Sequence, residues 1–90
     1  MYQLMPNRSQ LEVSGLNISQ WQLCQYLANQ TINNNGIEFD QFELARELVC
    51  AVNEVKPNLS FCVSKGYIVQ NDTRIDISPT FLIILDGQED

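Results

Sequence analysis

The chain has 90 residues, a formal charge of −6 at pH 7 and a hydrophobic fraction of 44%. These values are typical of one globular domain with a modest core, and not of a disordered segment. The five basic residues are scattered along the chain, which disfavours direct binding to nucleic acid or to an anionic membrane, because both depend on clustered Lys and Arg.

A single domain is expected over 1–90, with loosely ordered ends at 1–8 and 87–90. Within it, a short strand is predicted over 9–13, after an irregular or strand-like lead-in. The start of the chain lacks the apolar segment of a signal peptide, and its longest apolar run is too short to span a membrane. A cytoplasmic protein with free thiols is therefore expected.

A first helix is predicted over 18–30, with Asn17 or Ser19 as its N-cap, since each is followed three residues later by a Gln. Its apolar face consists of Trp21, Leu23, Cys24, Leu27 and Ala28. Its other face carries no charge and consists of Gln22, Gln25, Tyr26 and Asn29. A solvated helix usually carries charges, so this face is either covered or simply reflects a chain rich in Asn and Gln. A loop is predicted over 31–36.

A second helix is predicted over 40–56, where Asp40 is the expected N-cap and Glu43 completes a capping box. Phe39 and Leu44 have the spacing of a hydrophobic staple. The apolar side of this helix consists of Leu44, Ala45, Leu48, Val49, Ala51, Val52 and Val55. The opposite side carries Glu43, Glu47 and Glu54, with Cys50 beside them. The end at residue 56 is predicted because a proline follows and disfavours helix in the residue before it.

The carboxyl-terminal part predicts strands, because apolar residues alternate with polar ones from residue 59 onward. Strands are expected over 59–64, 67–70 and 74–77, with turns at 65–66 and 71–73, and an apolar strand over 81–85 follows Pro79. The expected fold is α+β, with two helices packed on one face of a three- to four-stranded antiparallel meander sheet and a short N-terminal strand. The predicted core is Trp21, Leu27, Leu44, Leu48, Val52, Phe61, Val63, Ile75, Ile77, Phe81 and Ile83.

Catalytic chemistry is not indicated by the sequence. The chain has no histidine, the most common general base and metal ligand, and no glycine-rich phosphate loop. The spacing of its three cysteines matches no metal or redox motif. Cys24 and Cys62 are expected to be small core residues, and neighbouring glutamates should raise the pKa of Cys50. No catalytic residue, metal or cofactor is therefore expected.

Two helices followed by a hairpin also fit a winged-helix domain that reads DNA. That alternative is disfavoured because phosphates would repel the glutamates on the outer face of the second helix. The sequence instead favours a regulatory or inhibitory module that binds another protein. The expected partner has a basic or nucleic-acid-binding surface, whose ligand the module would mimic in charge, as small phage-encoded inhibitors do.

The expected partner-binding residues on the second helix are Glu43, Arg46, Glu47 and Glu54. A second candidate surface on the first helix consists of Gln22, Tyr26 and Asn29. The alternative function is structural: a homodimer or larger assembly formed through the uncharged first helix or the apolar strand over 81–85.

Overall fold

The computed structural model describes residues 8–31 and 36–87. Its elements, in chain order, are α1 (Arg8–Ser14), α2 (Ile18–Thr31), β1 (Ile37–Glu38), α3 (Gln41–Leu48), α4 (Val52–Ser64), β2 (Ile68–Asn71), β3 (Arg74–Ile77) and α5 (Pro79–Gly87). The α+β class is confirmed. The packing differs from the expected two helices on a meander, because the part of the chain that the structure describes contains five helices and one small antiparallel sheet of three strands.

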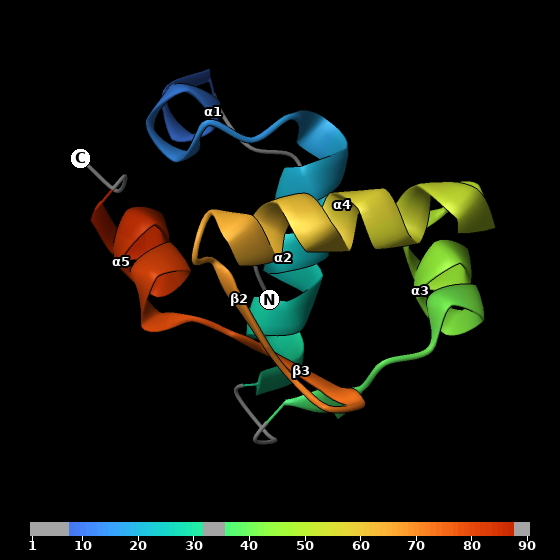
Figure 1. Cartoon of the computed structure of the whole chain (residues 1–90). Coiled ribbons are helices and arrows are strands. Elements are labelled where there is room, and N and C mark those ends of the chain that lie inside the picture. The colour runs from blue at the N-terminus through green and yellow to red at the C-terminus, as the bar shows by residue number, and fades with distance from the viewer. Residues whose placement is uncertain (1–7, 32–35, 88–90) are drawn as a thin grey trace.

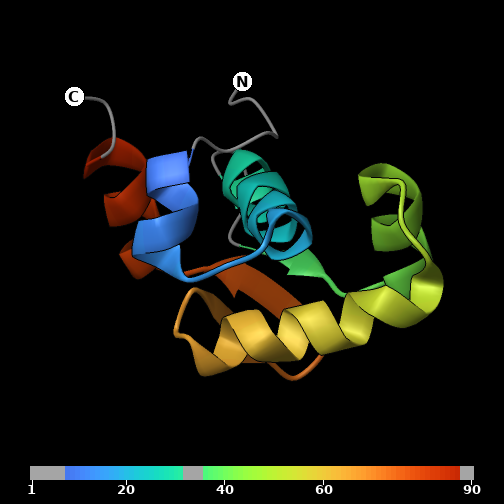
Figure 2. The ribbon, with the colours of Figure 1, turned by 90° about the horizontal axis from the view of Figure 1, so that it is seen from above.

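Helix α2 lies at the centre of the molecule. Helix α4 crosses it (Figure 1), while α1 and α5 lie on one side and α3 on the other (Figure 2). The predicted N-cap is confirmed at Asn17, whose side chain accepts from the Gln20 N–H at 2.8 Å while the Gln20 side chain accepts from the Asn17 N–H at 3.1 Å. The central position explains the absence of charge on this helix. Gln25, predicted on the outer face, is only 2% exposed.

The predicted second helix is two helices, α3 and α4, separated by a short turn. Asp40 caps α3 as predicted, since its Oδ1 accepts from the backbone N–H groups of Phe42 and Glu43. The helix stops because Val49 adopts a left-handed conformation with φ 53°, and its side chain is 90% exposed. The N–H groups of Val49 and Cys50 bond back to the carbonyls of Arg46 and Ala45. This pair of bonds forms a Schellman motif, in which glycine usually occupies the left-handed position.

Helix α4 continues through Pro57, so the predicted helix end at residue 56 and the predicted strand over 59–64 are both wrong. The reason is a stripe of three buried residues, Val55, Leu59 and Cys62, spaced four and three residues apart. Phe61, which the strand would have buried, is 36% exposed. Burial of this stripe outweighs the cost of about 3 kcal/mol that an internal proline imposes.

Strands β2 and β3 form the predicted hairpin, with a turn at Asp72 and with Ile75 and Ile77 buried as expected. Residues 65–66, predicted as a hairpin turn, instead join α4 to β2. Strand β1 was not predicted and pairs with β3, giving the sheet order β1-β3-β2. Gly36 precedes it with φ 87°, and a Cβ there would lie 2.7 Å from the Ile75 carbonyl oxygen.

The predicted strands over 9–13 and 81–85 are also helical, forming parts of α1 and α5, which pack against each other. In α5 a four-residue spacing buries Phe81 and Leu85, while Ile83 is 70% exposed. Of the predicted core, Phe61 and Ile83 are therefore wrong. Leu48, Val52 and Val63 are partly buried against the core, and the other six are buried. Most of the predicted lead-in over 1–8, of the 31–36 loop and of the predicted loose end over 87–90 lies outside the described residues, while residues 8 and 87 belong to α1 and α5.

Candidate protein-interaction site

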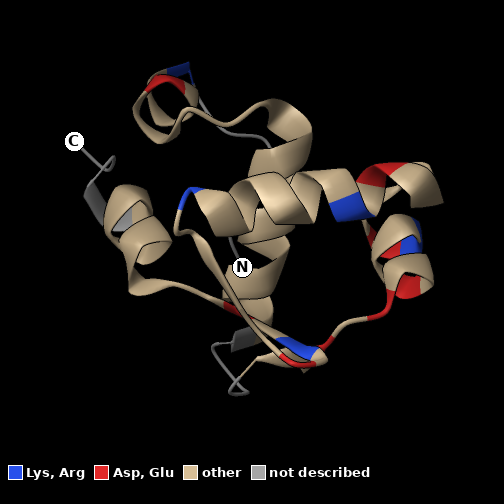
Figure 3. Cartoon of the chain, viewed as in Figure 1, with Lys and Arg blue, Asp and Glu red and all other residues tan. Residues whose placement is uncertain are grey.

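A groove of about 220 Å³ lies between α2, β1 and the start of α3. Its lining residues are Tyr26, Gln30, Ile37, Glu38, Asp40, Glu43 and Leu44. This set is called the acidic groove below, because all three of its charged side chains are carboxylates and all three are exposed. Acidic residues gather on α3 and on the segment that leads into it (Figure 3).

Local structure fixes the position of each carboxylate. Glu38 ends the short strand β1, where it pairs opposite Arg74 on β3. Asp40 is held by its two capping hydrogen bonds, and Glu43 follows in the first turn of α3. The helix dipole favours negative charge at this end of a helix. The backbone therefore offsets part of the repulsion among these carboxylates and holds them around one groove.

Tyr26, which was predicted in the surface on the first helix, lies close to carboxylates that were predicted in the surface on the second helix. Its side chain is half-buried on α2, and its pKa is raised, first by burial and then by the nearby charges of Glu47 and Glu43. Tyr26, Glu43 and Glu47 are therefore close in space although they come from two helices. An aromatic ring beside carboxylates suits a cationic side chain, which can contact both the ring face and the negative charge.

The other predicted residues are not part of the acidic groove. Arg46 is exposed in the last turn of α3. Glu54 lies in the first turn of α4, where its charge acts on Cys50. Gln22 lines a different pocket. Asn29 is half-buried, and its Oδ1 has no hydrogen-bond partner within the described part of the chain.

Sequence analysis missed Glu38, Asp40 and Gln30 as members of the site. Asp40 had been considered only as a helix cap. A signal for Glu38 was present, because residues 37–40 alternate apolar and acidic side chains as in an edge strand. The alternation spans four residues, which is too short to distinguish a strand from a loop.

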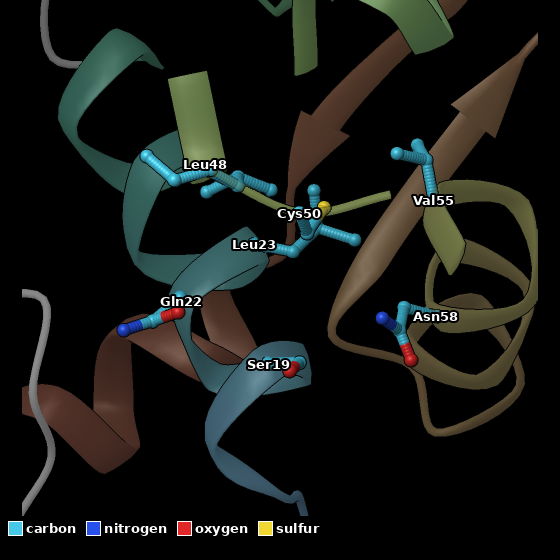
Figure 4. Close-up of a pocket in the computed structure, with 8 residues that line it drawn as sticks. Ser19, Gln22, Leu23, Leu48, Cys50, Val55 and Asn58 are labelled. Atoms are coloured by element: carbon cyan, nitrogen blue, oxygen red, sulfur yellow. The ribbon is translucent and has the colours of Figure 1, made fainter. Parts of the chain in front are cut away.

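The second pocket, of about 80 Å³, lies between α2, the turn after α3 and α4. Gln22 and Asn58 lie on opposite sides of it, and Cys50 lies beside Leu23 (Figure 4). Burial, and to a smaller extent the charge of Glu54, raises the pKa of the Cys50 thiol. A raised pKa lowers the thiolate fraction and makes Cys50 a poor nucleophile. The pocket is also well below the several hundred Å³ typical of small-molecule sites.

The described part of the chain offers neither a metal-ligand cluster nor a membrane-spanning helix. Within 8–31 and 36–87, no group of three or more His, Cys, Asp or Glu side chains could hold a metal ion. None of the helices described for this chain is both long enough and apolar enough to cross a membrane.

The order from α2 to β3 is helix, strand, helix, helix, strand, strand, with sheet order β1-β3-β2. This order is similar to that of a winged helix-turn-helix domain, where α3 and α4 would correspond to the helix pair and the β2–β3 hairpin to the wing. Helix α4 then occupies the recognition position. The sequence predicted Glu43, Glu47 and Glu54 on one helix, but only Glu54 lies on α4, while Glu43 and Glu47 lie on α3.

Comparison of the chain with family models, with curated proteins and with solved structures finds no match. The likeness to a winged helix therefore rests on the order of elements and on the sheet, and it describes architecture only.

Proposed function

We propose that this protein is a non-catalytic module that binds a basic surface of another protein through the acidic groove and thereby regulates or inhibits that partner. The observation that supports the proposal is the convergence of Glu38, Asp40 and Glu43 on one groove, with Tyr26 in its wall. This convergence distinguishes the site from a uniformly charged surface that serves only solubility.

Electrostatics explains why such a groove favours a cationic partner. Neighbouring carboxylates repel one another, and a Lys or Arg side chain placed among them removes that repulsion. The same charges accelerate encounter with a basic surface and reject acidic ones. Tyrosine is among the residues that most often dominate binding energy, because it combines a large apolar ring with a polar end.

Mimicry of nucleic-acid charge is the form of inhibition that this surface supports best. A protein that binds nucleic acid carries clustered Lys and Arg for phosphates, and carboxylates held on a rigid helix can occupy the same positions. On this proposal the winged-helix architecture serves as a scaffold for α3, and α4 does not read DNA.

A charge reversal in the groove tests the proposal. The partner is isolated from a host lysate on the immobilised protein, purified, and titrated calorimetrically at about 50 mM and about 500 mM salt. Glu43→Lys should weaken binding at least about tenfold at low salt, because it removes an attraction and adds a repulsion. The matched control is Glu12→Lys, which makes the same charge change on exposed α1 and should change the affinity less than about threefold.

Two results would contradict the proposal. One is an affinity that is the same at both salt concentrations and in both variants. The other is tight binding of duplex DNA by the purified protein at physiological salt, which would assign α4 and the hairpin to nucleic acid.

Self-association is the second candidate function, and one observation favours it. Ile83 and Leu82 project from α5 as exposed apolar side chains, and the neighbouring α1 exposes Val13. Sedimentation of the purified protein and of Ile83→Glu distinguishes the candidates. A dimer that persists at high salt and dissociates in Ile83→Glu would favour assembly, and a monomer in both would exclude it.

A further inference from the structure

Helices α2 and α4 pack against each other and cross (Figure 1), and each of them carries one buried cysteine. Cys24 on α2 and Cys62 on α4 are both 0% exposed. Their side chains are within hydrogen-bonding contact of each other, and Cys62 Sγ also lies 3.8 Å from the Gln20 carbonyl oxygen, to which it donates.

This arrangement differs from that of an isolated core cysteine, because the two cysteines come from separate elements and their side chains contact each other. A disulfide requires two sulfurs about 2.05 Å apart on Cβ atoms separated by a short gap. Two thiols in contact across packed helices would reach that geometry by a local shift of their side chains. Cys50, the third cysteine, lines the other pocket. The three cysteines therefore form one facing pair, Cys24 and Cys62, and one separate thiol.

We propose that Cys24 and Cys62 form a disulfide that links α2 to α4 when the chain folds in the presence of a small-molecule disulfide such as oxidised glutathione. The thiolate of one cysteine attacks a glutathione sulfur and releases one glutathione thiolate. The second cysteine thiolate then attacks the resulting mixed disulfide at the protein sulfur and releases the other. The two cysteines lose two protons and two electrons in total, and one glutathione disulfide becomes two glutathione thiols.

Burial determines when this reaction takes place. The hydrogen bond with Cys62, and then burial, raise the pKa of the Cys24 thiol, so the folded, reduced protein holds almost no thiolate at this position and reacts slowly. The bond should therefore form during folding, before the pair is enclosed. Once enclosed, the same burial protects the disulfide from external thiols.

The segment closed by the bond contains the whole acidic groove, because all of its lining residues lie between Cys24 and Cys62 in sequence. Closure of this segment by the disulfide restricts the conformations of the unfolded chain and leaves the folded groove unchanged. The predicted effect is a more stable protein with an unaltered binding surface, independent of the function proposed above.

The test uses a Cys50→Ser variant, which leaves only the facing pair. It is denatured, refolded in a buffer of reduced and oxidised glutathione, and compared with the same variant refolded under reducing conditions. We expect an intact mass about 2 Da lower, from loss of two hydrogens, and no alkylation after denaturation. We also expect a Tm at least about 10 °C higher than that of the reduced form, from closure of the intervening segment.

Three results would overturn the proposal. They are two free thiols after oxidative refolding, a stable mixed disulfide with glutathione in place of the internal bond, and an internal bond that lowers the Tm. The comparison needs no substitution at Cys24 or Cys62, so a failure of such variants to fold cannot affect it. Cys50→Ser in its reduced form reports any effect of the substitution itself.

Discussion

Pro57 lies in the second turn of α4, with its side chain exposed to solvent. A proline there has no N–H to donate to the carbonyl of Asn53, and its ring crowds that carbonyl. The helix is held instead by its buried stripe, which includes Leu59 and Cys62. The residue therefore lowers the stability of a helix that tertiary packing maintains.

Replacing Pro57 by alanine should raise the free energy of unfolding by about 2 kcal/mol, because the helix regains a hydrogen bond and loses a steric conflict, partly offset by the greater freedom of the unfolded chain. Urea denaturation followed by circular dichroism measures the change. Ser60→Ala, at an exposed position on the same helix, is the control and should change stability by less than about 0.5 kcal/mol. A destabilised Pro57→Ala protein would show that α4 requires the distortion that proline causes.

At the scale of elements, α5 shows how one apolar run permits two structures. Residues 81–85 are apolar throughout, so a strand and a buried helix were equally compatible with them. A strand would bury Phe81 and Ile83 on the same face. The helix buries Phe81, whose ring centroid lies 4.7 Å from that of Trp21, and exposes Ile83.

Alanine substitutions in α5 distinguish these two structures. Phe81→Ala should lower the free energy of unfolding by about 3–5 kcal/mol, because it removes a fully buried aromatic side chain and leaves a cavity. Ile83→Ala should lower it by less than about 0.5 kcal/mol, since Ile83 is mostly in contact with water. Thermal or chemical denaturation measures both variants. Similar losses in the two variants would indicate that residues 81–85 bury both side chains.

Elements whose signals are local were predictable from the sequence. The Asn17–Gln20 pair, the Asp40 cap and the turn at Asp72 each depend on residues within a few positions of one another, and the structure contains all three. Two further features were missed. Strand β1 depends on a distant partner, because it exists only through its pairing with β3. The end of α3 is local, but it is formed by Val49, a residue type that seldom adopts a left-handed conformation.

At the scale of the whole molecule, the order of the elements and the distribution of charge disagree. The order of α3, α4 and the hairpin is similar to that of a winged helix-turn-helix domain, but α3 carries Glu43 and Glu47, which phosphates would repel. The sequence predicted Glu43 and Glu47 as a surface, because their spacing on one helix is a local property. The sequence could not predict that Tyr26 lies close to them, because this proximity depends on how α2 and α3 pack.

Alkaline pH should destabilise the reduced protein as a whole. The pKa of Cys24 is raised above its ordinary 9.0, first by the hydrogen bond with Cys62 and then by burial. The pKa of Cys50 is raised above 9.0, and those of Tyr26 and Tyr67 above 10.0, chiefly by burial. The unfolded chain releases these protons at lower pH than the folded protein does. Stability from these groups is therefore complete below about pH 9 and falls as the pH rises further.

Urea denaturation under reducing conditions at a series of pH values measures this loss. The free energy of unfolding should decrease from about pH 9 and decrease more steeply above about pH 10, where tyrosines of the unfolded chain ionise. Tyr26→Phe should have a shallower decrease above about pH 10, because one of these groups is removed. A free energy of unfolding that stays constant across this pH range would contradict the claim that folding raises the pKa values of these cysteines and tyrosines.

The pairing of Trp21 with Phe81 also gives the molecule an internal optical reporter. Trp21 is the only tryptophan in the chain and is fully buried, so all indole fluorescence comes from one buried site that packs against α5. Detachment of α5 would expose the Trp21 indole to water and shift its emission to longer wavelength, even while the rest of the molecule stayed folded. A spectrum recorded without any label would thus distinguish fraying of the carboxyl-terminal helix from an intact fold.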